Sequence, residues 1–148
     1  MANNKRVRIA ALVEHENHVC CRYRIRAFQE ALALAGIDLD IFAIPQGVLG
    51  RVRFFRTLSH YDGVIVQRVL LPRTELTLLR YAAKFLIFDF DDAVWLRDSY
   101  SIRGMESRKR FSRFRAMIRA CDLIVAGNAF LAESAKQYTQ DERIIRIP

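Results

Sequence analysis

Three carboxylates stand close together at the end of an apolar run, in the segment KFLIFDFDDAVW from Lys84 to Trp95. They belong to Asp89, Asp91 and Asp92. Placing this much acid beside an apolar strand costs free energy unless a partner compensates for it. Four kinds of partner fit the pattern: a metal ion, a phosphoryl intermediate, a sugar hydroxyl group or neighbouring arginines.

The tripeptide Asp89-Phe90-Asp91 superficially matches the phosphatase pattern in which the first acid is the nucleophile and the second is the general acid. In this chain, however, Asp92 replaces the usual flexible glycine, and Ala93 stands where threonine or valine is expected. An Asp-x-Asp metal site for a nucleotide sugar is a second interpretation, based on one short motif.

A third interpretation follows from strand geometry, because successive side chains of a strand point to opposite faces. Asp89 and Asp91 would then share one face and point towards the basic loop after the first strand, while Phe88 and Phe90 enter the core. We expect arginines to hold Asp89, and Asp91 and Asp92 to lie at the rim of a pocket.

Apolar runs alternate with helical patterns along the whole chain, which predicts an α/β fold. The pattern indicates a Rossmann-like parallel sheet of about six strands with helices on both faces. No linker divides the chain, so residues 1–148 are expected to form one domain. The predicted strands are 7–13, 38–44, 62–69, 84–90, 122–128 and 143–148, and the predicted helices are 23–36, 49–61, 72–83, 105–121 and 129–139.

The loop after the first strand lacks the glycines that a dinucleotide fingerprint needs, so NAD or FAD binding is not expected. It offers Glu16 and His18 instead, followed by Arg22, Arg24 and Arg26 at the expected start of a helix. Cations at that position oppose the helix dipole, which suggests a bound anion. The alternative is that these arginines pair with nearby acids. Glu14, His15 and His18 do not have a recognised zinc-ligand spacing.

The chain is strongly basic, with a net charge of +8 and an isoelectric point near 9.9. This charge calls for an anionic partner such as a phosphorylated substrate or a membrane surface. No nucleic-acid motif is present, so a nucleic-acid partner is not expected. The basic amphipathic helix predicted at 105–121 could contact a membrane or another anion through Arg110, Arg113 and Arg115, or simply expose a solvated basic face. Three cysteines without disulfide or metal-ligand spacing suggest a reducing cytoplasm.

The order of five segments resembles the N-terminal domain of the retaining family-4 (group 1) glycosyltransferases, which have the GT-B fold. The resemblance covers nearly the whole chain. The segments that carry it are YRIRAFQEALALAGIDLDIF, YDGVIVQRVLL, KFLIFDFDDAVW, ACDLIVAGNAFLAESAKQY and RIIRIP.

This resemblance implies a cytoplasmic enzyme that transfers a sugar from a nucleotide-sugar donor to a glycan or lipid-linked acceptor, at the inner face of the membrane and without an obligatory metal or other cofactor. In such enzymes the N-terminal domain binds mainly the acceptor. The C-terminal domain binds the donor and carries a pair of glutamates, and this chain has no counterpart of it. We therefore expect the chain alone to be inactive and to act together with its own C-terminal domain.

Carried over residue by residue, the resemblance implies a set of substrate-binding positions around the ends of the first, fourth and fifth strands. Asp91 and Asp92 are also the best catalytic candidates. The first loop departs from the common Gly-Gly form of the family. A phosphohydrolase using Asp89 and a non-catalytic basic binding module remain the alternatives. The substrate-binding candidates are Glu16, His18, Arg22, Arg24, Asp91, Asp92 and Asn128.

Overall fold

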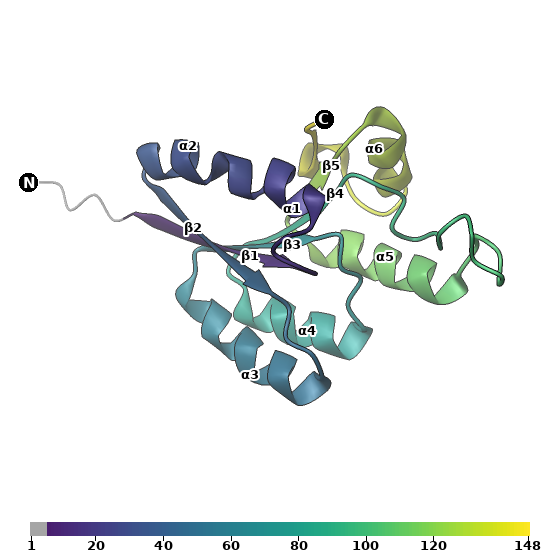
Figure 1. Cartoon of the computed structure of the whole chain (residues 1–148), viewed down its shortest axis with the longest axis horizontal. Helices are drawn as coiled ribbons and strands as arrows, with labels where there is room; N and C mark the ends of the chain where they lie inside the picture. Colours follow the sequence, from purple (N-terminus) through teal and green to yellow (C-terminus); the bar gives the residue numbers. More distant parts are fainter. Residues whose placement is uncertain (1–5) are drawn as a thin grey trace, which may run out of the picture.

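Six short apolar segments form one parallel sheet in the computed structural model, which describes residues 6–148 (Figure 1). The strand order is β2-β1-β3-β4-β5-β6, and every neighbouring pair is parallel. The predicted α/β class and all six predicted strands are confirmed. The strands are β1 (Val7–Val13), β2 (Ile37–Ala43), β3 (Gly63–Gln67), β4 (Leu86–Phe90), β5 (Leu123–Ala126) and β6 (Ile144–Arg146).

Helices cover both faces of this sheet, with α1 and α2 on one face and α3, α4 and α5 on the other (Figure 1). Helix α6 packs at the edge against β5 and β6. Within the described residues, three short 3-10 helices lie at Arg26–Phe28, Leu58–His60 and Asp141–Arg143. The α-helices are α1 (Val19–Arg24), α2 (Gln29–Leu34), α3 (Val48–Thr57), α4 (Arg73–Ala82), α5 (Arg108–Ala120) and α6 (Ala129–Lys136).

The first predicted helix differs from the structure in where it begins and in its continuity. It begins at Val19 rather than Tyr23, and it breaks at Ile25, whose φ of −120° and ψ of −64° are not helical. Arg22 and Arg24 therefore lie in the last turn of α1, where positive charges interact favourably with the helix dipole. The expectation that Arg22 and Arg24 stand at a helix start is wrong, so the argument for a bound anion from the helix dipole no longer applies to them.

Alternation along the strands divides the apolar side chains between two cores. In β1, Ala10 and Leu12 join the large core beneath α3, α4, α5 and α6. Ala11 and Val13 point the other way and pack with Cys21 of α1. A parallel sheet covered on both faces needs apolar residues at consecutive positions, which explains the unbroken apolar runs in the sequence.

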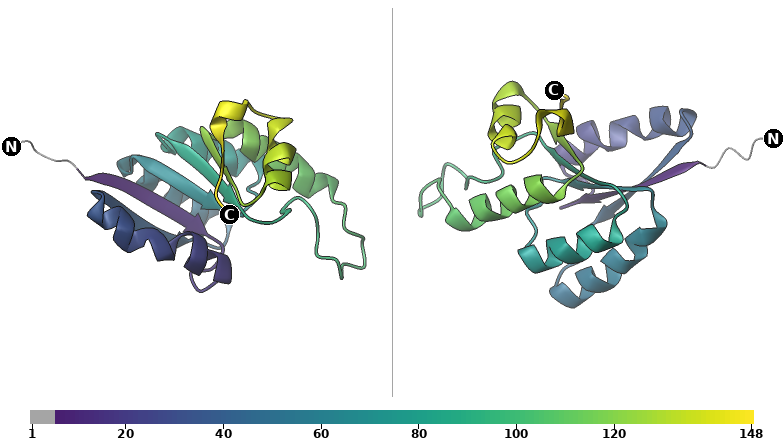
Figure 2. Two further views of the ribbon diagram at one scale, coloured as in Figure 1. Left: turned by 90° about the horizontal axis from the view of Figure 1, so that it is seen from above. Right: turned by 180° about the vertical axis from the view of Figure 1, so that it is seen from behind.

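Strand β4 follows the predicted alternation. Phe88 and Phe90 are fully buried in the large core, with ring centroids 5.1 Å apart. Asp89 lies between them in sequence and faces the α1 side of the sheet, where it is also buried. Part of the connection from β4 to α5, residues 91–107, extends away from the body of the domain (Figure 2), although Val94 and Trp95 within it are buried in the large core. The predicted separation of the aromatic residues from Asp89 is therefore confirmed.

Candidate functional site

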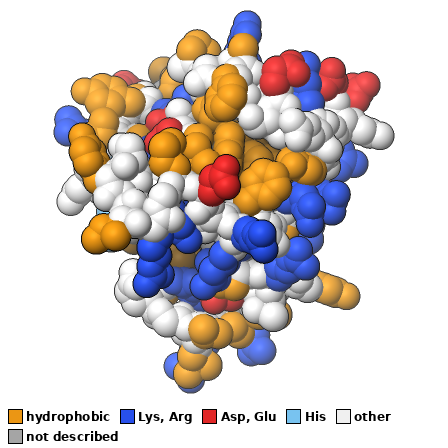
Figure 3. All heavy atoms as spheres, turned by 90° about the vertical axis from the view of Figure 1, so that its right-hand side faces the viewer, with side chains coloured by type: hydrophobic (Ala, Val, Ile, Leu, Met, Phe, Trp, Pro, Cys, Tyr) orange, Lys and Arg blue, Asp and Glu red, His pale blue; other side chains and the backbone are white. Residues whose placement is uncertain are grey.

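The strand order reverses between β1 and β3, because the chain leaves β1 towards β2 on one side and continues from β3 towards β6 on the other. Parallel α/β sheets bind their ligands outside the carboxyl ends of the strands at such a point. Glu14 directly follows β1, and Arg68 directly follows β3. Figure 3 views this edge and shows many Lys and Arg side chains gathered in its lower half.

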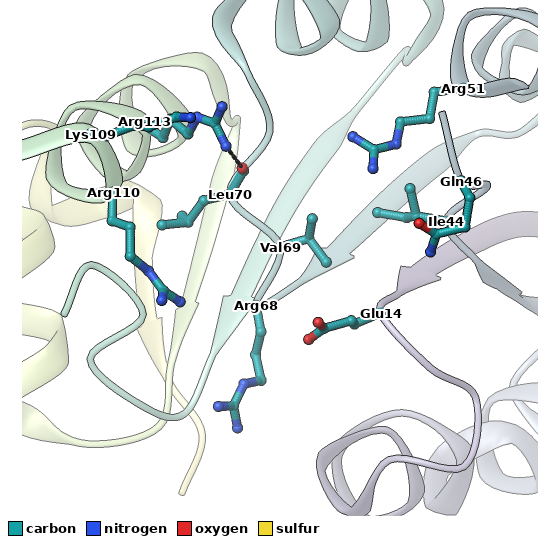
Figure 4. A pocket seen from close by; sticks show the side chains of 10 residues that line it. All are labelled: Glu14, Ile44, Gln46, Arg51, Arg68, Val69, Leu70, Lys109, Arg110 and Arg113. Carbon is teal, nitrogen blue, oxygen red and sulfur yellow. Dashed lines mark hydrogen bonds between the residues drawn. The ribbon is translucent and has the colours of Figure 1, made fainter. Parts of the chain in front are cut away.

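Two adjoining pockets open at this edge, with volumes of about 500 and 520 Å³. Three side chains, those of Glu14, Arg68 and Arg110, line both of them. The basic pocket is lined by Glu14, Ile44, Gln46, Arg51, Arg68, Val69, Leu70, Lys109, Arg110 and Arg113 (Figure 4). The turn pocket is lined by Glu14, Arg68, Asp92, Ala93, Val94, Leu96, Arg97, Asp98, Ser99, Tyr100, Met105 and Arg110.

Arg68 is the residue that joins the strand ends. Its Nη1 donates to Asp91 Oδ1 at 3.2 Å and to Cys20 Sγ at 2.8 Å, and its Nη2 lies 3.5 Å from Asp92 Oδ2. Burial, with a smaller effect from Asp91, raises the pKa of the Cys20 thiol, so the sulfur that accepts this bond stays neutral. One guanidinium thus connects helix α1 with the ends of β3 and β4.

The backbone of Arg68 is also unusual, because its φ is 62° although it is not glycine. Its N–H donates to the carbonyl oxygen of Asp89 at 2.8 Å, which holds the chain in this conformation. Such conformations cost about 1–3 kcal/mol and are concentrated at functional sites. Sequence reasoning missed Arg68, and the available signal was the polar pair Gln67-Arg68 at the end of an apolar strand.

The three acids of the opening motif have different environments. Asp89 forms a buried ion pair in which Arg24 Nη2 is 2.7 Å from Asp89 Oδ1, and Gln67 Nε2 donates to Asp89 Oδ2 at 3.2 Å. Asp89 lines neither the basic pocket nor the turn pocket. Arginine therefore holds Asp89, as the strand geometry predicted.

Asp91 and Asp92 lie where the chain leaves β4. Asp92 keeps 70% of its side chain exposed and lines the turn pocket, while its Oδ1 accepts a bond from the Ala93 N–H at 2.7 Å. Asp91 is half-buried against Arg68 and lines neither pocket. The structure thus places Asp92 at a pocket rim and puts Asp91 behind Arg68.

The other predicted substrate-binding residues line neither pocket. His18 caps α1, with its Nδ1 accepting from the Cys20 N–H, and Asn128 caps α6 in the same way through the Leu131 N–H. Glu16 lies 3.8 Å from Arg26. Arg22 stands over the ring of Tyr23, and Arg24 is the buried partner of Asp89.

Two of the three predicted anion contacts on α5 reach the basic pocket. Arg110 Nε donates to the carbonyl oxygen of Val94 at 3.1 Å, and Arg113 Nη1 donates to that of Leu70 at 3.4 Å. Both bonds orient a guanidinium without neutralising it. Arg115 lines neither pocket, so it does not share the pocket lining to which Arg110 and Arg113 belong.

Gly127 allows the end of β5 to approach the acidic turn, which leads to a testable prediction. A Cβ at this position would lie 2.9 Å from Asp91 Cα, a backbone atom that cannot easily move. We expect Gly127→Ala to lower the free energy of unfolding by about 1–3 kcal/mol in denaturant titrations. The control is Gly50→Ala in α3, where the new Cβ would meet Pro45 Cβ at an ordinary 3.5 Å and helix propensity favours alanine. Equal destabilisation of the two variants would contradict the close approach.

Residues 6–148 contain no group of three or more His, Cys, Asp or Glu side chains arranged to hold a metal ion. In the same described range, no helix has the length and apolar character needed to cross a bilayer. No protein-family model matches the chain, and no curated protein sequence matches it.

The two pockets differ in what they can bind. The turn pocket combines the carboxylates of Asp92 and Asp98 with the hydroxyl groups of Ser99 and Tyr100, a set that can bind sugar hydroxyl groups. The basic pocket has cations on several walls, which suits a phosphate or carboxylate. Because the pockets adjoin, one ligand bearing both hydroxyl and anionic groups can occupy them together.

Proposed function

We propose that this chain is the acceptor-binding domain of a retaining sugar transferase that works at the cytoplasmic face of a membrane. The observation that carries the proposal is the pair of adjoining pockets at the switch point, one suited to sugar hydroxyl groups and the other to an anion. A glycan or lipid-linked acceptor would lie across both. The resemblance in the order of the chain's segments to the N-terminal domain of GT-B enzymes supports the same conclusion.

In this proposal Asp92 accepts hydrogen bonds from acceptor hydroxyl groups, because its carboxylate is exposed and lines the turn pocket two residues beyond the end of β4. Asp91 acts through Arg68, which it holds at the boundary of the two pockets. Arg110 and Arg113 provide the contact with anionic groups of the acceptor or of the membrane.

The remaining parts of the reaction belong to a second domain. That domain would bind the nucleotide-sugar donor and provide the paired glutamates of the family, without an obligatory metal. The 148-residue chain is therefore expected to bind acceptor without transferring sugar to it.

Acceptor binding can be measured directly on the chain. We would screen an array of neutral and phosphorylated oligosaccharides and then titrate the best-bound member by NMR. Asp92→Asn should weaken that binding about tenfold, since it removes a charge-assisted hydrogen bond. Asp141→Asn makes the same chemical change outside both pockets and should have no effect.

Two results would contradict the proposal. Sugar transfer by this chain alone would show that the donor site lies within it. Hydrolysis of p-nitrophenyl phosphate that disappears in Asp89→Asn would favour the phosphohydrolase alternative. The buried ion pair of Asp89 with Arg24 argues against that alternative, because a nucleophile must reach its substrate.

A further inference from the structure

The cations of the basic pocket are unevenly neutralised. Arg51 pairs with Glu75 at 2.8 Å, and Arg68 pairs with Asp91. Within residues 6–148, no carboxylate forms an ion pair with the other cations that line the pocket. These unneutralised cations are Lys109, Arg110 and Arg113, all from the first two turns of α5.

The location on α5 increases the imbalance. The helix begins with Ser107 as its cap and has no acid in its first turn, so basic side chains stand beside the positive end of the helix dipole. The only carboxylate that lines the pocket, among the described residues, is that of Glu14 on the opposite side. A bound anion would offset the charge that the protein leaves uncompensated.

Two of these cations are oriented before any ligand arrives. The carbonyl oxygens of Val94 and Leu70 hold Arg110 and Arg113 and leave their charge intact. Figure 4 shows the cations of α5 on one side of the pocket, Arg51 on the other and Arg68 between them. Guanidinium groups fixed around a space bind phosphate oxygens through paired, charge-assisted hydrogen bonds.

We propose that the basic pocket binds a phosphate-bearing group, a phosphomonoester or a diphosphate. Its volume of about 500 Å³ exceeds that of one phosphate, and it continues into the turn pocket through Arg68 and Arg110. A sugar attached to the phosphate can therefore lie in the turn pocket. The phosphate site itself is inferred from the basic pocket alone. The further statement that the acceptor carries the phosphate rests on the proposed function.

The test is calorimetric titration of the chain with inorganic pyrophosphate at low and at moderate salt. The wild-type chain should bind it, and binding should weaken with salt. Lys109→Gln/Arg113→Gln should bind at least about tenfold more weakly. The matched control, Arg115→Gln/Arg119→Gln, removes the same charge from the same helix outside the pocket and should change the affinity less than about twofold.

Glu14→Gln provides a test in the opposite direction. Glu14 is exposed and forms no ion pair among the described residues, so its replacement should leave folding intact. Removing the one carboxylate that lines the pocket should strengthen pyrophosphate binding roughly threefold, because a like charge near the anion disappears. A gain of this kind cannot result from a damaged fold.

Binding of the chain to phosphatidylcholine vesicles with and without phosphatidic acid distinguishes a lipid phosphate from the phosphate of a soluble sugar. Tyr100, which lines the turn pocket, and Ile102, two residues further along the chain, are fully exposed. If the phosphate is carried by a lipid, the acidic vesicles should bind the chain, and Ile102→Ser should abolish this while pyrophosphate binding persists. If it is carried by a soluble sugar, pyrophosphate binds and the vesicles do not.

The proposal is overturned if pyrophosphate does not bind, or if the pocket and control variants weaken it equally, since the effect would then come from diffuse surface charge. Both variants are first compared with the wild type by circular dichroism. Lys109→Gln alone, which removes no internal bond recorded for the described residues, replaces the double variant if that one does not fold. If the chain binds an oligosaccharide but not pyrophosphate, the proposed function is retained with an uncharged acceptor and the phosphate site is rejected. If it binds pyrophosphate but no oligosaccharide, the phosphate site is retained and the proposed function is rejected.

Discussion

Replacing Arg24 with alanine should lower the free energy of unfolding by about 3–5 kcal/mol, because it leaves the Asp89 carboxylate buried without its counter-ion. The side chains are only 12% and 6% exposed, and Arg24 Nε and Nη2 both donate to the carboxylate. A domain of this size is stable by only about 5–15 kcal/mol in total. Guanidinium unfolding followed through the fluorescence of Trp95, the only tryptophan, measures the loss.

Two further variants test whether the uncompensated charge of Asp89 causes this loss of stability. Arg26→Ala breaks an ion pair with Glu16 in which both side chains are about half exposed, and exposed pairs contribute at most about 1 kcal/mol. The double variant Arg24→Met/Asp89→Leu removes both charges and should recover most of the stability. Gln67 keeps its bond to the Cys20 carbonyl oxygen in that variant. If the double variant is as unstable as Arg24→Ala, an uncompensated charge is not the cause.

Arg24 also connects three distant segments. Besides Asp89 of β4, its Nη1 donates to the carbonyl oxygen of Ile147 at 2.9 Å. The side chain therefore ties α1 to the central sheet and to the residues after β6. An arginine that seemed available for a substrate phosphate is instead used to hold the fold together.

Phe114→Ala should have a similarly large effect, lowering the free energy of unfolding by about 3–5 kcal/mol through the cavity it creates. The ring is 1% exposed and lies 4.5 Å from the ring of Trp95 and 5.4 Å from that of Phe90, measured between centroids. Denaturant titrations measure the loss. Near-ultraviolet circular dichroism should also change, because Trp95 loses its nearest aromatic neighbour.

The control for this variant lies on the same helix. Phe111 is 40% exposed and meets only the ring of Tyr138 among the described aromatic residues, so Phe111→Ala should cost less than about 1.5 kcal/mol. Phe114→Leu keeps most of the volume and should cost less than Phe114→Ala. If Phe111→Ala and Phe114→Ala proved equally destabilising, the aromatic cluster would not be the centre of this core.

The aromatic cluster of Phe90, Trp95 and Phe114 also affects the candidate site. Trp95 follows the acidic turn by three residues, and its ring packs on Phe90 and Phe114. This packing fixes the chain just beyond Asp92, where the turn pocket begins. We therefore expect Phe114→Ala to loosen ligand binding in the turn pocket as well as to destabilise the fold.

Local patterns in the sequence were sufficient to predict the sheet. Each strand is a run of apolar residues between polar or glycine-containing loops, and this pattern depends only on neighbours along the chain. A helix cap depends on the same local signal, since Asn128 stands directly before an amphipathic segment and caps α6. The break in the first helix was not predictable in this way, because the residue at the break is Ile25 and not a helix-breaking glycine or proline.

By itself, then, the sequence determined the α/β class, the six strands and the opposite orientations of Asp89 and its phenylalanine neighbours. Only the tertiary structure decided which charged groups meet. Arg24 and Asp89 are 65 residues apart, and Arg68 reaches Asp91 and Cys20 from a different strand end. Periodicity records the direction in which a side chain points but not the partner it finds across the sheet. For this reason the acids at the end of β4 were recognised as special from the sequence, and Asp89 was expected to pair with arginine. Only the fold showed that Arg24 is the partner of Asp89 and that Asp91 lies behind Arg68.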